Sequence, residues 1–329
     1  MRRLASIGLA LALAACPSKS PPTTTPTPQA AAGCPSAAGV HLASYVTQDP
    51  GQGRSGWAVA LHAVPAGADA PGYANVDAAA ASAAGVPAPP TGTLWLVTPG
   101  ATPCRASVGR YYAAKLDTSV SYGFELEGCP APAQPEDAGG VVMVSEQPPT
   151  GCRFEGPQPI AARLGDMDAA KQWQRPAKET PLPAPLAAAL PQRECAAPGC
   201  ERLWAFADVK IDGHPVAWTG AVNWLQIGDP AQQCQWPAER VSGFWIPDST
   251  GTRAIKVGEG DAHALPLIAV LADATGARVA LAEANGEYAT YDLAPGRATL
   301  GHRVVWTIAP PEAWQAVDYL GPICDEPRP

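Results

Sequence analysis

The sequence predicts a mainly β protein with some α structure (an α+β fold), built as two disulfide-braced domains with antiparallel sheets, short helices and long Pro/Gly-rich loops. Three observations support this fold class. Short stretches alternate between apolar and polar residues, as half-buried strands do. The chain carries nine cysteines. Its 38 prolines and 32 glycines interrupt it too often for long regular elements.

The first half of the chain predicts a mixture of strands and helices. Residues 119–128 are the clearest strand, because every second residue from Val120 to Leu126 is apolar and polar residues or Gly123 lie between them. This alternation predicts one packed face and one solvated face. Apolar runs bounded by turn residues predict further strands, and apolar or alanine-rich stretches without alternation predict helices. The strands are expected at 93–98 and 140–145, and the helices at 57–64, 73–84 and 160–173.

The second half predicts strands almost throughout. Asn285-Gly286 is the strongest short hairpin signal in the chain, and Thr275-Gly276 marks another turn, so the strands around them should form a meander. A turn near Asp212-Gly213 joins two longer strands. The strands are expected at 203–211, 216–227, 267–272, 277–284, 287–293 and 304–308, followed by a short helix from Pro311.

The first sixteen residues have the parts of an export signal. Arg2 and Arg3 form a positively charged start, and the apolar run that follows ends in small residues before Cys16. The run is shorter than the roughly 20 apolar residues that cross a bilayer. This segment therefore predicts an exported protein.

The last four residues of this segment, Leu13-Ala14-Ala15-Cys16, resemble the lipobox of bacterial lipoproteins. The resemblance implies cleavage before Cys16, a diacylglycerol thioether on its sulfur and an acyl chain of the palmitate type on the new amino group. Several acyl chains together hold a protein firmly to a membrane. Pro17, rather than an acidic residue, follows Cys16, which favours the outer membrane, facing the periplasm or the cell surface.

Composition divides the chain into five parts. After a signal peptide at 1–15, residues 16–33 comprise the lipidated cysteine and a Pro/Thr-rich stalk, which lacks large apolar residues and favours extended polyproline II. The first, α+β, domain is expected at 34–175. A proline-rich linker at 176–194 separates it from the mostly β, Trp-rich second domain at 195–329.

The cysteines predict a disulfide framework. If Cys16 carries lipid, an even number remains, as in exported proteins with disulfides. Four precede the linker and four follow it, which suggests two bridges in each domain; Cys195 and Cys200 are spaced to close a small loop, although spacing alone does not fix the pairing. The disulfide candidates are Cys34, Cys104, Cys129, Cys152, Cys195, Cys200, Cys234 and Cys324.

Charge and motifs exclude several function classes. The formal net charge is −8 and no Lys/Arg cluster occurs, which argues against nucleic-acid binding. The glycines between Gly51 and Gly56 fit GxGxxG, but no strand directly precedes them, so they are interpreted as a loop. No HExxH, GxSxG or P-loop occurs. We therefore predict no cofactor, no metal site and no catalytic residue; the alternative is an envelope hydrolase with an active site near Asp261 and His263, or His302.

Tryptophan is concentrated in the second domain, which has seven of the ten. Flat aromatic faces can stack on sugars, so Trp236, Trp245 and Trp218 are candidates for a ligand platform. Core packing of these large apolar rings is the favoured interpretation, and the ligand platform is the alternative. Trp236 and Trp245 are expected to be the most exposed, because prolines follow them closely. The sequence thus predicts a lipid-anchored cell-envelope protein with a binding or structural role, whose partner is a cell-wall glycan or an envelope protein.

Overall fold

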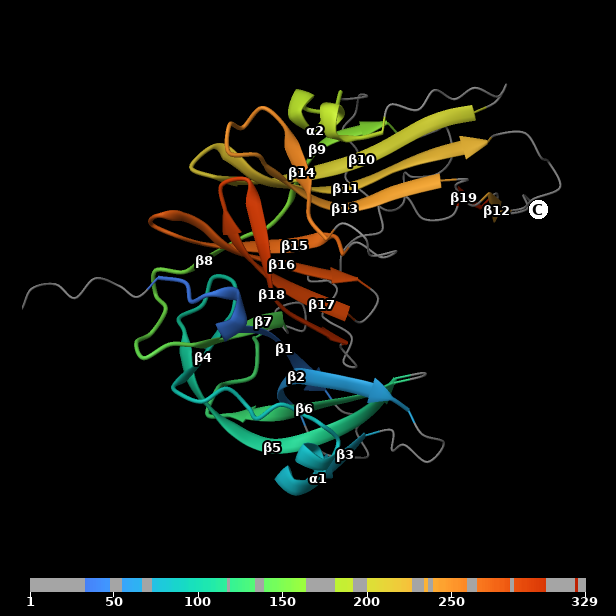
Figure 1. Ribbon diagram of the computed structural model, residues 1–329. Coiled ribbons are helices and arrows are strands. Elements are labelled where there is room, and N and C mark those ends of the chain that lie inside the picture. The colour runs from blue at the N-terminus through green and yellow to red at the C-terminus, as the bar shows by residue number, and fades with distance from the viewer. Residues whose placement is uncertain are drawn as a thin grey trace, which may run out of the picture. The chain divides into compact units, whose positions relative to one another are not determined.

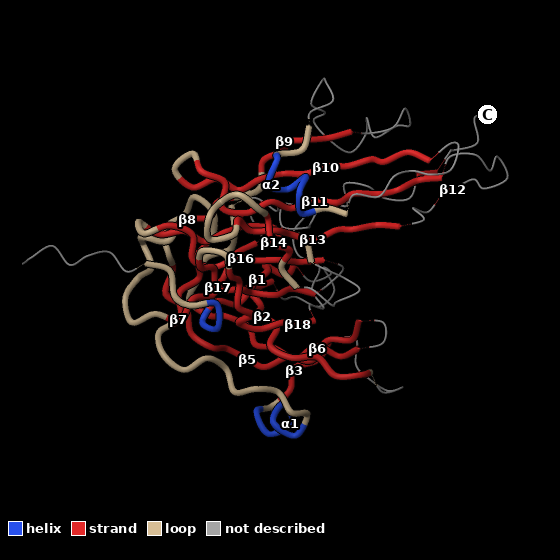
Figure 2. The backbone as a smooth tube through the Cα atoms, turned by 45° about the horizontal axis from the view of Figure 1, so that its top comes forward, coloured by secondary structure: helices blue, strands red, loops and turns tan. Residues whose placement is uncertain are grey.

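The computed structural model describes most of the chain between Gly33 and Val305, together with Ile323–Cys324 (Figure 1). Strands dominate, and the helices are short (Figure 2). This confirms a mostly β protein with antiparallel sheets. No helix in this part of the chain is long and apolar enough to cross a membrane. The described residues are 33–47, 55–66, 73–116, 119–133, 139–163, 181–191, 200–226, 234–235, 239–258, 265–284, 287–305 and 323–324.

The first sheet, which we call the ring sheet, closes on itself. β5 pairs with β4 through residues 104–106 and with β6 along most of its remaining length, so the strands form a closed ring in the order β1-β2-β6-β5-β4-β7. β3 adds to β5. In the sequence, η1 precedes β1, and the helix α1 lies between β3 and β4. The elements are η1 Ala37–Gly39, β1 Val40–Thr47, β2 Ser55–Pro65, β3 Tyr73–Val76, α1 Ala78–Ala83, β4 Leu94–Val97, β5 Cys104–Leu116, β6 Ser119–Glu127 and β7 Gly139–Val144.

Two open five-stranded sheets follow. The central sheet has the order β18-β17-β16-β15-β8, and the outer sheet has the order β14-β13-β11-β10-β9. Helix α2, Ala184–Ala189, lies between β9 and β10 in sequence, and β12 Cys234–Gln235 pairs with β19 Ile323–Cys324. The remaining strands are β8 Arg153–Glu155, β9 Gln158–Arg163, β10 Cys200–Ile211, β11 His214–Gln226, β13 Glu239–Pro247, β14 Ala254–Lys256, β15 Leu267–Asp273, β16 Gly276–Ala284, β17 Glu287–Ala294 and β18 Arg297–Val305.

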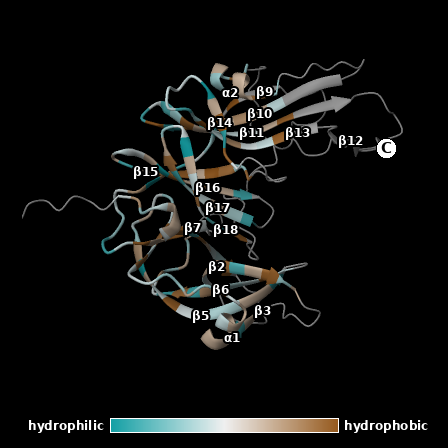
Figure 3. Cartoon of the chain, in the orientation of Figure 1, coloured by the Kyte–Doolittle hydropathy of each residue, from teal (hydrophilic) through white to brown (hydrophobic). Residues whose placement is uncertain are grey.

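The central sheet is apolar on both faces because it packs against both other sheets. On β16, Val279 and Leu281 join a cluster with ring-sheet residues, whereas the alternating Ala280 and Ala282 join a cluster with outer-sheet residues. Successive side chains of a strand point to opposite faces, so a strand buried on both faces reads as continuously apolar. The apolar residues, brown in Figure 3, accordingly lie mainly in the strands. The ring sheet also has an interior core of its own, which includes Trp57, Val59 and Phe124.

The helix predicted at 57–64 is wrong: this segment is the strand β2. Trp57 and Val59 lie in the ring core, and Ala58 and Ala60 on the opposite face are buried as well. Burial of both faces removed the alternation that identifies a strand, and pairing with β1 and β6 overrode the helical propensity of alanine.

Of the other two predicted helices, the one at 73–84 is partly present, and the one at 160–173 is wrong over its described residues. The segment predicted at 73–84 begins as the strand β3, and α1 starts after Asp77, whose side chain accepts a hydrogen bond from the Ala80 amide at 2.6 Å. Residues 160–163 of the helix predicted at 160–173 belong to the strand β9, and the rest lies outside the described residues. The predicted strands at 93–98, 119–128 and 140–145, and those from 203 to 293, are confirmed, with small changes at their ends.

The solvated face predicted for residues 119–128 is wrong in the middle of that strand. Ser121 and Gly123 are buried, and the side chain of Tyr112, which is opposite Gly123 on β5, lies over this position. A Cβ atom on Gly123 would lie 2.0 Å from the Val59 carbonyl oxygen and 2.6 Å from the Tyr112 hydroxyl oxygen. Only glycine fits this crowded position.

The sheets do not divide at the linker predicted at 176–194. β8 and β9, which precede that linker, pair with β15 and β10, which follow it. Within the linker itself, α2 and Leu190 pack on the outer sheet. The described chain from Gly33 onward thus belongs to one compact unit, and independent folding of residues 34–175 and 195–329 stays a prediction.

Candidate functional site

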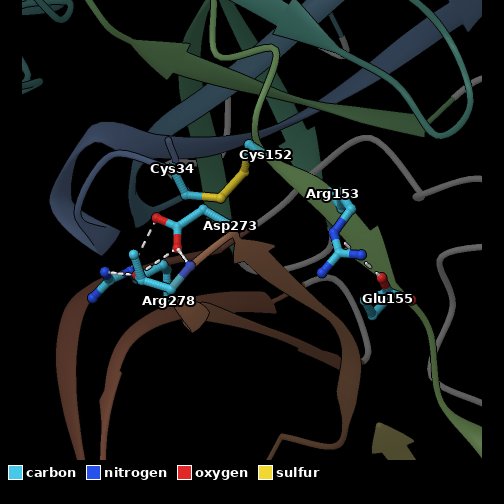
Figure 4. The surroundings of a disulfide bond; sticks show 7 residues. Cys34, Cys152, Arg153, Glu155, Asp273 and Arg278 are labelled. Carbon is cyan, nitrogen blue, oxygen red and sulfur yellow. Dashed lines mark hydrogen bonds and ion pairs between the residues drawn. A yellow bond between two sulfur atoms is a disulfide. The ribbon is translucent and has the colours of Figure 1, made fainter. Parts of the chain in front are cut away.

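The described chain is covalently braced where it begins. Cys34 is joined to Cys152, just before β8 (Figure 4). Cys104, the first residue of β5, is joined to Cys129, just after β6. The four candidates before the linker therefore pair among themselves, as predicted. The first disulfide ties Cys34, next to the first described residue, to the segment that leads into β8.

Polar contacts surround the start of the described chain. A Cβ atom on Gly33 would lie 2.7 Å from Asp273 Oδ2, so the chain passes directly over that carboxylate. Asp273 Oδ1 accepts hydrogen bonds from the Thr275 amide at 2.8 Å and hydroxyl at 2.6 Å, and its Oδ2 pairs with Arg278 Nε at 3.0 Å (Figure 4). Burial acts to raise the pKa of Asp273, but these hydrogen bonds and the Arg278 charge outweigh it and lower that pKa.

The most unusual polar cluster joins the ring sheet to the central sheet. His41 of β1 and His302 of β18 stack with their ring centroids 4.5 Å apart and their planes 21° apart. Tyr288 of β17 packs edge-on against His302, and its hydroxyl donates to the Ala60 carbonyl oxygen at 3.1 Å. Burial lowers the pKa of His41 to about 3, with a smaller contribution from His302, and burial lowers the pKa of His302 to about 4. Both rings are therefore neutral at pH 7.

Hydrogen bonds indicate which nitrogen atoms carry the protons. Thr290 Oγ1 donates to the Ala37 carbonyl oxygen at 3.0 Å and lies 3.3 Å from His302 Nδ1. Because the hydroxyl has only one proton, His302 Nδ1 must donate to it, which assigns the lone pair to Nε2. His302 Nε2 and His41 Nδ1 are buried and have no hydrogen-bond partner among the described residues.

Two neutral imidazoles suggest a metal site, but their geometry does not fit one. A ligating nitrogen points its lone pair at the ion in the plane of its ring, at about 2.0–2.1 Å for zinc. The near-parallel stacked planes of His41 and His302 share no such point. In the described part of the chain no group of three or more metal-ligating side chains gathers. What the pair can do is respond to acid, because a proton on either ring would place a charge between two packed sheets.

The candidate tryptophans of the outer sheet lie in a core. Trp218 and Trp245 are paired across β11 and β13, and only 3% and 1% of their surfaces are exposed. They pack with Phe206 beneath Leu186 and Leu190, which belong to α2 and its end. The expectation that Trp245 is exposed is therefore wrong, because the proline-rich segment covers it. Neither ring offers a free face to a ligand here.

A buried acid lies on this same face of the outer sheet. Asp208 follows Phe206 by two positions on β10, is opposite Trp218, and is 5% exposed. Lys210 Nζ lies 3.2 Å from its Oδ2, with half of the Lys210 side chain in solvent. A buried carboxylate needs a partner of opposite charge, and this ion pair supplies it. Asp208 is therefore paired with Lys210 beside the aromatic core of the outer sheet.

Several predicted site residues lie outside the described residues: Cys16, Cys195, Trp236, Asp261 and His263. Cys200 begins β10, and Cys234 and Cys324 are directly opposite one another in β12 and β19. The sequence pattern singled out His302 but not His41. No local signal connects them, because the two residues come from distant strands that only the packing of two sheets brings together.

Comparison of the chain with protein-family models, with curated proteins and with solved structures finds no match.

Proposed function

We propose that this protein is a lipid-anchored component of the bacterial cell envelope with a binding or structural role. The observation that carries the proposal is the charged, apolar leader ending in Leu13-Ala14-Ala15-Cys16. The two disulfides support it, because stable disulfides form in oxidising compartments outside the cytoplasm. On this proposal, residues 17–33 form a stalk of up to roughly 50 Å between the lipid and Cys34.

Metabolic labelling with a palmitate analogue tests the anchor. The wild-type protein should take up the label, and Cys16→Ser should not, because its hydroxyl replaces the thiol that forms the thioether. Cys104→Ser is the matched control, since it replaces a disulfide-bonded cysteine of the ring sheet without touching the leader, and it should be labelled as the wild type is. Label on Cys16→Ser, or an unlabelled wild type, would contradict the proposal.

We propose a cell-wall glycan or an envelope protein as the partner. The candidate that remains for a stacking platform is Trp236, because Trp218 and Trp245 are buried under α2. Titration of residues 33–329 with cell-wall fragments, followed by tryptophan emission and melting temperature, tests the glycan. A saturable change that is lost in Trp236→Ala supports a glycan site; an unchanged emission and melting temperature would rule the glycan out for this surface.

The described geometry gives the hydrolase alternative no specific support. His302 stacks on His41 and its Nε2 atom is buried, so this atom cannot reach a substrate in the arrangement described. Activity on a panel of envelope substrates that His263→Ala abolishes, with the fold intact, would favour the hydrolase instead.

A further inference from the structure

Four cysteines after the linker remain to be paired. The disulfides Cys34–Cys152 and Cys104–Cys129 use the four that precede it. If all of the others are oxidised, four cysteines allow three sets of two bridges. The four are Cys195, Cys200, Cys234 and Cys324.

The backbone register distinguishes one of these sets. β12 and β19 pair in antiparallel fashion, with Cys234 opposite Cys324 and Gln235 opposite Ile323. Residues directly opposite in such a pair have Cα atoms about 4.5 or 5.5 Å apart. Disulfides need a Cα separation of about 4.4–6.8 Å, and the two disulfides described above have 4.9 and 5.8 Å. Either kind of opposite pair therefore suits a bridge.

We propose that Cys234 and Cys324 form a third disulfide and that Cys195 and Cys200 form the fourth. The inference rests on the proposed export, because the thiols must meet an oxidant. Two thiols lose two protons and two electrons as the sulfur–sulfur bond forms, and the electrons reduce the disulfide of an oxidised dithiol carrier protein to a dithiol. The Cys234–Cys324 bridge closes a loop that contains every strand from β13 to β18.

Tryptic mapping without reduction separates the alternatives, because the cleavage sites isolate the relevant cysteines. After alkylation of free thiols, Cys234 lies in peptide 211–240 and Cys324 in peptide 304–329, while the other two cysteines share peptide 194–202. The expected result is peptide 211–240 linked to 304–329, and an unalkylated 194–202 that is two hydrogen masses lighter than its reduced form. A link from 194–202 to either of the other two would overturn the inference.

Single substitutions supply an independent readout. Cys324→Ser should leave one alkylatable thiol, at Cys234, and peptide 194–202 should keep its internal bridge. In the matched variant Cys200→Ser, the new thiol should appear at Cys195 and the link between 211–240 and 304–329 should persist. Alkylation of peptide 194–202 in Cys324→Ser would contradict the pairing.

The same digest distinguishes failure of this inference from failure of the proposed export. Peptides 20–54, 55–105 and 116–153 contain the cysteines of the two disulfides already described. If these three are linked while 211–240 is alkylated, the third disulfide is absent and export stands. If protein from its own host is alkylated at all of these cysteines, both the inference and the exported, oxidising location are wrong.

Discussion

The ring sheet and the central sheet are stabilised in opposite ways. The ring sheet closes its own hydrogen-bond ladder, encloses its own core and contains a disulfide between Cys104 and Cys129. The central sheet is open, takes its edge strand β8 from a distant part of the sequence, and buries each face against another sheet. The ring sheet is therefore stabilised mainly by its own contacts, whereas the central sheet depends on contacts with its two neighbouring sheets.

Cutting the chain should have the largest effect. Residues 33–152, which contain the ring sheet, should melt cooperatively, although at a lower temperature than the whole protein because one outer face loses its cover. Residues 195–329, the predicted second domain, should fail to fold, because they lack β8 and β9 and expose the ring-facing side of the central sheet. Circular dichroism melting and amide dispersion in NMR spectra provide the measurement.

The matched control for that cut is the fragment 153–329, which restores β8 and β9 but still lacks the ring sheet. It should be more stable than 195–329 and less stable than the intact chain. A native-like melt of 195–329 alone would instead establish the two independent domains that the linker at 176–194 predicts.

The two disulfides should differ in their stabilising effect according to the loops they close. Cys34 and Cys152 are 118 residues apart, and Cys104 and Cys129 are 25 apart. Chain entropy predicts a loss of about 5 kcal/mol for the double serine variant of the first pair and about 3.5 kcal/mol for that of the second. Urea denaturation of the two double variants measures this difference. A larger loss for the ring-sheet pair would show that its bridge acts through the native ring and not through the unfolded chain.

Local patterns predicted the strands that alternate or are bounded by turn residues, including β7, which is buried on both faces, but missed the strand β2. The meander from Leu267 to Ala294 was found because its turns are marked by Gly276 and by Asn285-Gly286. The strand β2 was missed because the apolar residues on its two faces give no period of two. No local sequence pattern indicates that the ring sheet closes. The start of α1, by contrast, could have been predicted from the N-cap residue Asp77.

The candidate site shows the same limit. Cysteine parity correctly grouped Cys34, Cys104, Cys129 and Cys152, because parity and order along the chain are properties of the sequence. The stacking of His41 on His302, and the covering of Trp245 by α2, depend on which layers meet. The local pattern of a single sequence does not indicate which sheets and helices pack against one another.

Acid should weaken the joint between the ring sheet and the central sheet. The pKa values of His41 and His302, about 3 and about 4, lie below the ordinary 6.5. As the pH falls, the unfolded chain therefore binds protons before the folded chain does. The free energy of unfolding keeps its full value above about pH 6.5 and decreases toward pH 4. In this pH range each histidine should lower the free energy of unfolding by about 1.4 kcal/mol per pH unit, or by about 2 kcal/mol in total at pH 5.

Urea denaturation at pH 7.5 and pH 5 tests this with His41→Phe, which keeps an aromatic ring in the stack and removes the unpartnered Nδ1. This variant should lose about 2 kcal/mol less than the wild type between the two pH values. His214→Gln, at an exposed turn, is the control and should behave as the wild type does. Nearby charged groups such as Glu287 and Arg303 are present in all three proteins, so their contribution to the pH dependence cancels when the proteins are compared. Equal acid losses in His41→Phe and the wild type would exclude His41 as the cause.

The smallest expected effects compare two buried threonines at the two faces of the central sheet. Thr219 Oγ1 accepts from the Leu267 amide at 2.9 Å and donates to the Gly243 carbonyl oxygen at 3.3 Å, joining the outer sheet to β15. Thr219→Val leaves a buried amide donor without a partner, which costs about 1–3 kcal/mol.

Thr290→Val should cost a similar amount, because His302 Nδ1, which lies 3.3 Å from this hydroxyl and donates to it, loses its acceptor. The Ala37 carbonyl oxygen also loses the Thr290 hydroxyl but still accepts from the Val40 amide, and a carbonyl with one donor is tolerated better than an amide with none. Urea midpoints with unchanged m-values measure both variants, and hydrogen exchange at the Leu267 amide should accelerate only in Thr219→Val. If Thr290→Val proved clearly the more damaging, the joint between ring sheet and central sheet would depend on the His302–Thr290–Ala37 chain of hydrogen bonds more than on the apolar contacts around it.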